Sequence, residues 1–150
     1  METSKIENFW PKNIIASLEN QNLPFSILEQ QAKYFNELYG KVLHAKVVSR
    51  KIDISTENAT KIKANLVHSL RIIAPKMDNY YFDIVKLIQS DISAYPIKID
   101  SPFLDTENKR SDRLKITNKK ELENILKDIF NDSQTIEVLS NLIKQSNSKD

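Results

Sequence analysis

Apolar residues follow two different periods along this chain, one typical of helices and one typical of strands. Over 26–39 they recur at steps of three and four, which predicts a helix with one buried face. Ser26 and Glu29 are spaced as a capping box, and Gly40 is placed to end the helix in a left-handed conformation. The segment 11–20 has the same spacing and opens on a proline suited to a first helical turn. Two N-terminal helices are therefore predicted.

After the glycine the pattern changes to alternation, which is typical of strands. Residues 41–54 are rich in β-branched side chains, and the polar segment 55–60 can close a hairpin. Residues 61–74 alternate strictly between apolar and other positions, as a half-buried strand requires. The turn formers of 75–79 then lead into a returning strand, 80–89. These segments predict an antiparallel meander.

The register of the last hairpin follows from its side chains. A turn centred on Met77 places Arg71 opposite Asp83 on one face, where the opposite charges attract. On the other face it forms the apolar pairs Ile72–Phe82, Leu70–Ile84 and Leu66–Ile88. A slip of one residue would break all of these matches.

The rest of the chain predicts one more strand and two more helices. Residues 94–100 form a short strand that Pro96 confines to an edge or a bulge, and 101–113 form a solvated loop. An Asn-x-x-Glu capping box begins a helix over 118–131, and a second helix covers 133–145.

The predicted fold class is α+β, an antiparallel meander of three or four strands with two N-terminal and two C-terminal helices packed on the sheet. The chain has 150 residues, of which 40% are apolar and 28% charged, an ordinary globular composition. We expect a single domain over 1–150, frayed at 1–10 and 145–150.

The composition excludes several kinds of active site. One glycine cannot build a phosphate-cradling loop, and the absence of cysteine excludes thiolate metal sites and cysteine nucleophiles. The two histidines are not spaced as ligands on one helical face. We therefore expect no cofactor, no metal and no catalytic residue set.

Two polar residues interrupt the apolar sheet face. His68 lies mid-strand on this face, and the predicted register pairs it with Lys86. A first hairpin turning near Thr56 would bring His44 opposite His68 as well. These three residues are candidate ligand-binding residues for an anion or carboxylate. The alternative is a half-exposed histidine beside a lysine whose amine reaches water, and this alternative is favoured.

The densest basic segment is a second candidate site, for nucleic acid. Phosphate contacts would come from six residues: Lys109, Arg110, Arg113, Lys115, Lys119 and Lys120. Acidic residues dilute this segment, however, and no aromatic residue within it could stack on bases. A solvated loop is the preferred interpretation.

Apolar residues on both faces of the third predicted strand suggest a covered second face. The register places Tyr81, Val85 and Leu87 opposite Phe82 and Ile84. One of the chain's own helices is the favoured cover, and a partner protein or a second copy is the alternative. Phe9 and Trp10 are expected to pack beside Pro11, with an exposed docking plug as their alternative.

The function favoured by these exclusions is a non-catalytic binding or regulatory module that acts through protein–protein contact or self-association. No signal peptide or long apolar run is present, which predicts a cytoplasmic protein without membrane contact. Two alternatives stay open. They are a nucleic-acid-associated protein using 109–120, and a small enzyme or ligand-binding domain using His68 and Lys86.

Overall fold

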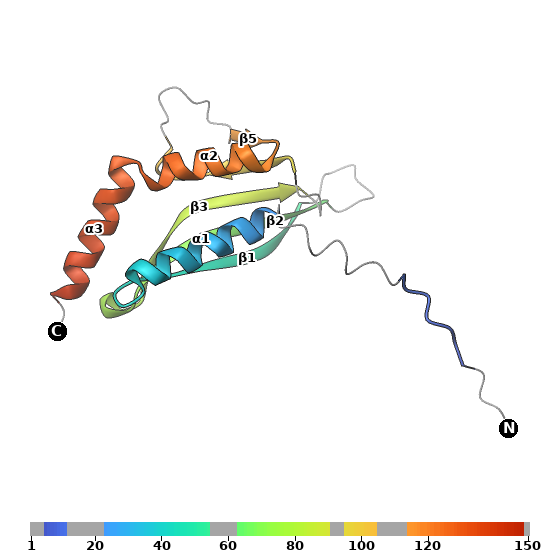
Figure 1. Ribbon diagram of the computed structural model, residues 1–150, viewed down its shortest axis with the longest axis horizontal. Coiled ribbons are helices and arrows are strands. Elements are labelled where there is room, and N and C mark those ends of the chain that lie inside the picture. The colour runs from blue at the N-terminus through green and yellow to red at the C-terminus, as the bar shows by residue number, and fades with distance from the viewer. Residues whose placement is uncertain (1–4, 12–22, 55–62, 91–94, 105–113, 149–150) are drawn as a thin grey trace.

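The computed structural model describes residues 5–11, 23–54, 63–90, 95–104 and 114–148. Within these ranges a five-stranded antiparallel sheet carries three α-helices, which confirms the α+β class (Figure 1). The strands lie across the sheet in chain order: β1 (His44–Ile54), β2 (Lys63–Ala74), β3 (Tyr80–Ser90), β4 (Ile97–Asp100) and β5 (Leu114–Ile116). The helices are α1 (Pro24–Tyr39), the short 3-10 helix η2 (Pro75–Met77), α2 (Lys119–Phe130) and α3 (Ser133–Asn147).

The sheet has one strand more than predicted, and β4 is not an edge strand. Pro96 precedes β4, so every residue of the strand can use its N–H, and β4 pairs with both β3 and β5. The three-residue strand β5 is too short to show a period in the sequence. The predicted helix over 11–20 lies outside the described residues apart from its exposed first residue, Pro11.

Helix α1 begins and ends differently from the prediction. It starts at Pro24, a favourable first helical residue, and its N-cap Leu23 makes no side-chain bond, so the predicted Ser26–Glu29 capping box is wrong. Gly40 has a right-handed backbone conformation, with φ −63°, so it does not end the helix in the predicted left-handed conformation. A Cβ at Gly40 would collide with the Asn36 carbonyl oxygen, which accepts the Gly40 N–H. The glycine therefore allows a close approach and does not supply an unusual φ.

The two faces of the sheet differ in what packs against them, and cross-strand partners lie on the same face. One face, which we call the helix face, packs against all three helices in one core that includes Leu28, Ile72, Leu87, Ile99 and Leu122. Figure 1 shows α1 along β1 and β2, α2 beside β5, and α3 at the end of the sheet where β2 turns into β3. None of the described helices covers the other face, which we call the open face.

The β2–β3 hairpin confirms half of the predicted register. Arg71 lies opposite Asp83 and forms an ion pair of 2.9 Å from Nε to Oδ1. Ile72 lies opposite Phe82, as predicted. Beyond this point a β-bulge shifts the register by one residue, and the remaining predicted pairs are wrong. The pairs that form instead are Leu70–Val85 and Leu66–Gln89.

Ile84 is the extra residue of this bulge. Its carbonyl oxygen accepts a hydrogen bond from the Ser101 hydroxyl at 2.6 Å, and its side chain is buried in the core. Because a bulge leaves one residue out of the ladder, its carbonyl needs another partner, and Ser101 supplies the donor. Ser101 is itself buried, so the predicted solvated loop is wrong at its first residue, and 105–113 lie outside the described residues.

The bulge also determines which side chains of β3 lie on each face of the sheet. Val85 and Leu87 turn to the helix face and are completely buried by the chain's own core, while Tyr81 stays on the open face at 53% exposure. The predicted strand with apolar side chains on both faces is therefore wrong for Val85 and Leu87. Covering by a partner is not required to explain them.

The C-terminal helices agree more closely with the prediction. Asn118 caps α2 by accepting the Glu121 N–H at 2.9 Å, and the Glu121 carboxylate accepts the N–H and hydroxyl of Thr117. These bonds lower the pKa of the Glu121 carboxyl group. Helix α3 continues to Asn147, so the predicted fraying from 145 is wrong for 145–147, and Ser146 is buried there.

Candidate functional site

The three predicted ligand-binding residues do not come together. His68 lies opposite Leu87 on one side and Ser49 on the other, all on the helix face. Lys86 lies opposite Ser69, and His44 lies opposite Ile73, both on the open face. The predicted pairing of His68 with Lys86 and His44 is wrong, because the bulge shifts β3 by one residue and β1 pairs in a different register.

His68 is instead the middle of three hydrogen-bonded polar side chains, one each from β1, β2 and β3. Its Nδ1 lies 2.7 Å from the Ser49 hydroxyl, and its Nε2 lies 3.3 Å from Gln89 Oε1. An amide oxygen only accepts, so Nε2 carries the proton and donates, while Nδ1 accepts from Ser49. The Phe25 ring lies 5.3 Å from the imidazole ring, between centroids. Both ring nitrogens of this buried histidine are thus satisfied.

Burial lowers the pKa of His68 below its ordinary 6.5, and the hydrogen bond to Gln89 opposes this shift only in part. Lys86 takes no part in this shift, since it lies opposite Ser69 on the other face of the sheet. Gln89 orients the ring without the negative charge that would stabilise an imidazolium. The His68 imidazole is therefore neutral in this hydrogen-bonded row.

We expect the free energy of unfolding to fall as the pH drops below about 6.5. In this range His68 binds a proton in the unfolded chain but stays neutral in the folded protein. The slope attributable to one such proton is at most about 1.4 kcal/mol per pH unit. Above pH 6.5 this contribution is constant. Urea unfolding of the wild type and His68→Gln between pH 5 and 8 measures the difference.

His44→Gln is the matched control, since His44 is exposed on the open face. This variant should keep the wild-type slope, whereas His68→Gln should flatten it between the folded pKa and pH 6.5. Equal slopes in the wild type and His68→Gln would contradict the assignment.

The predicted basic segment is described only in part. Lys109, Arg110 and Arg113 lie outside the described residues. Lys115 is exposed on the open face, and Lys119 and Lys120 are exposed in the first turn of α2. The described members therefore belong to different elements.

A groove that the sequence did not predict lies between α1 and α3. Its floor is formed by sheet residues from β2 and β3, and its walls are the C-terminal half of α1 and the first three turns of α3. Thr135 fixes the α3 wall, because its buried hydroxyl donates to the Ile129 carbonyl oxygen of α2 at 2.6 Å. Asn36 fixes the α1 wall through two hydrogen bonds to Ala45 of β1.

None of the fifteen described residues that line this groove carries a formal charge, in a chain with 28% charged residues. The volume is about 530 Å³, which is within the usual range of binding pockets. The lining residues are Gln31, Tyr34, Phe35, Leu38, Tyr39, Leu70, Ile72, Ile84, Phe130, Asn131, Thr135, Ile136, Leu139, Ser140 and Ile143.

Apolar side chains at the rim of the groove remain open to solvent. Leu38 is 73% exposed, and Ile136, Tyr34 and Tyr39 are each between 44% and 50% exposed. Leu38 and Tyr39 belong to the apolar stripe that the sequence predicts over 26–39, but the stripe does not indicate how much of it a neighbour covers.

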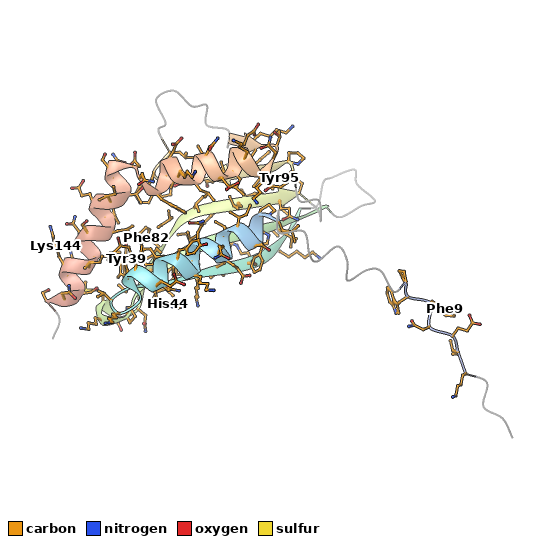
Figure 2. The ribbon with its side chains drawn as sticks, viewed as in Figure 1. Phe9, Tyr39, His44, Phe82, Tyr95 and Lys144 are labelled. Carbon is orange, nitrogen blue, oxygen red and sulfur yellow. The ribbon has the colours of Figure 1, made fainter. Side chains whose placement is uncertain are left out.

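A second exposed apolar group lies on the N-terminal arm, which we define as residues 5–11. Ile6, Phe9 and Trp10 are 85%, 82% and 76% exposed, so the predicted packing of Phe9 and Trp10 is wrong in the described arm. Figure 1 shows the arm beyond the end of the sheet opposite α3, and Figure 2 shows Phe9 far from Tyr39. The arm therefore does not occupy the groove of its own chain in this structure.

Two kinds of feature are absent from the described part of the chain. None of the described helices combines the length and the apolar composition that a membrane span requires. No group of three or more histidine, cysteine or acidic side chains there could hold a metal ion.

No known protein family, no curated protein and no solved structure matches this chain.

Proposed function

We propose that this protein is a non-catalytic binding module that self-associates, the α1–α3 groove of one copy taking the N-terminal arm of another. The observation that carries the proposal is the uncharged groove with its exposed apolar rim. The arm offers the complementary chemistry, three exposed apolar side chains within five residues. Exposed apolar surfaces of this kind are typical of protein interaction sites.

A second copy is the proposed occupant because the described arm does not lie in the groove of its own chain, with Phe9 far from Tyr39 (Figure 2). If each copy supplies one arm and one groove, the contact is reciprocal and closes as a two-fold dimer.

The energy of such a contact can be bounded. Burying Phe9 and Trp10 removes roughly 300–500 Å² from water, a gain of about 8–12 kcal/mol. Association itself costs roughly 4–15 kcal/mol, so a single docked arm gives weak binding at best. Reciprocal docking doubles the buried area for one association cost. We therefore expect a dimer that forms in a concentration-dependent way.

We expect the protein to change from monomer to dimer as its concentration rises, as measured by sedimentation velocity. Trp10 is the single tryptophan of the chain, so its fluorescence emission should move to shorter wavelength in parallel. Phe9→Ser with Trp10→Ser should abolish the dimer by removing the arm's anchors. Leu38→Lys should do the same from the groove side while keeping a good helix former at the helix end.

Ile52→Ser is the matched control, because Ile52 is an exposed apolar residue outside the groove. It should leave the dimer unchanged. A mixture of the arm variant and Leu38→Lys should associate only weakly, at higher concentration than the wild type, since one intact groove and one intact arm remain. A monomer at all concentrations, or a dimer insensitive to arm and groove variants, would overturn the proposal. A buried Trp10 at every concentration would mean that the arm docks on its own chain.

A further inference from the structure

The open face of the sheet collects basic side chains that are scattered along the sequence. Its described side chains include six cations and only two carboxylates, Asp83 and Asp100. The whole chain carries a formal net charge of only +2, so the described remainder and the undescribed residues together are acidic on balance. The cations are Lys46, Arg50, Arg71, Lys86, Lys98 and Lys115.

Two pairs of like charges lie directly opposite each other on this face. Lys98 faces Lys115 across β4 and β5, and Lys46 faces Arg71 across β1 and β2. Like charges in this arrangement repel at a distance of roughly 5 Å between Cβ atoms, which destabilises the sheet. Asp83 is already paired with Arg71, and Asp100 lies opposite Lys86. An external anion between the paired cations would relieve the repulsion.

The open face carries an exposed aromatic ring. Val67 and Ile88 pair across β2 and β3 in the row between Arg50 and Lys98, but they are only 3% and 8% exposed and offer little surface to a ligand. The Tyr81 ring is 53% exposed, and the Arg71 guanidinium carbon lies 4.0 Å from its centroid. Cations on the same face as an exposed ring suit a chain of phosphates with a base stacked on that ring. A duplex keeps its bases stacked inside and could use only the cations.

We propose that the open face binds single-stranded nucleic acid, with Lys46, Arg50, Lys98 and Lys115 contacting phosphates and Tyr81 contacting a base. This site is independent of the α1–α3 groove, which lies on the opposite face of the sheet. Binding of this kind is electrostatic, and its affinity falls as salt rises. It differs from the basic segment predicted at 109–120, with which it shares only Lys115.

The test is fluorescence anisotropy of labelled oligothymidine against a salt series, using the full chain. A quadruple variant removes the four phosphate-contacting cations: Lys46→Gln, Arg50→Gln, Lys98→Gln and Lys115→Gln. We expect it to weaken binding at least ~10-fold at low salt and to reduce the salt slope by about 0.7 per lost contact. Tyr81→Ala should weaken binding about 5- to 100-fold, whereas Tyr81→Phe should not.

A matched quadruple variant removes the same charge from exposed lysines outside the open face: Lys33→Gln, Lys41→Gln, Lys127→Gln and Lys144→Gln. It should bind like the wild type. Equal weakening by both quadruple variants, or no binding at low salt, would overturn the proposal. Duplex bound as tightly as the single strand would overturn the single-stranded assignment. Binding only to phosphatidylserine vesicles would replace nucleic acid by a membrane surface.

Discussion

Replacing Leu87 with alanine is expected to lower the free energy of unfolding by about 2–5 kcal/mol, the range for a fully buried leucine. Leu87 has no exposed surface and lies mid-sheet, opposite His68 of β2 and Ile99 of β4. Loss of its methyl groups leaves a cavity that the ladders on both sides prevent from closing. Urea unfolding at constant pH measures the loss.

This substitution also tests the bulge. Without the extra residue at Ile84, Leu87 would lie on the open face with Tyr81, outside the core that packs against the helices, and its truncation would cost less. Lys98→Ala on the open face is the control and should change stability by no more than about 0.5 kcal/mol. Similar effects of the two substitutions would mean that β3 is not bulged as described.

The parts of the fold that sequence could predict are those fixed by near neighbours in the chain. The turn after Ala74, the Arg71–Asp83 pair and the Asn118 cap each depend on residues less than fifteen positions apart. Charge attraction, turn chemistry and capping act over such short spans. These three predictions are confirmed.

The bulge could not be predicted in this way. Ile84 is β-branched and ordinary in a strand, with no glycine or proline to mark an irregularity. Its carbonyl depends on Ser101, which lies seventeen residues later and beyond another strand. The wrong pairing of His68 with Lys86 and the wrong face for Leu87 both follow from this single residue, because side chains alternate along a strand. The wrong pairing of His68 with His44 comes from the register of β1 and β2.

The open face and the groove could not be predicted from the sequence for a related reason. The open face gathers cations from five strands, and their common face becomes visible only when all four ladders are in register. The groove depends on how far α1 and α3 stand apart. A helical stripe indicates which side of a helix is apolar, but not how much of that side a neighbour covers.

Asn36 joins α1 to the edge of the sheet. Its Nδ2 donates to the Ala45 carbonyl oxygen at 2.9 Å, and its Oδ1 accepts the Ala45 N–H at 2.7 Å. Ala45 belongs to the edge strand β1 and is buried, so neither backbone group can turn to water. One side chain thus satisfies the outward donor and acceptor of an edge strand, which would otherwise be open to pairing with another chain.

Asn36→Ala is expected to cost about 2–4 kcal/mol, because it removes two hydrogen bonds and leaves a buried donor and acceptor without partners. The α1 wall of the groove should loosen with it, so the variant should also exchange the Ala45 amide proton faster than the wild type. Glu37→Ala, at the exposed neighbouring position of the same helix, is the control and should leave both stability and exchange unchanged. If Asn36→Ala unfolds at the wild-type urea concentration with Ala45 still protected from exchange, the hydrogen bonds of Asn36 do not hold the helix to the sheet.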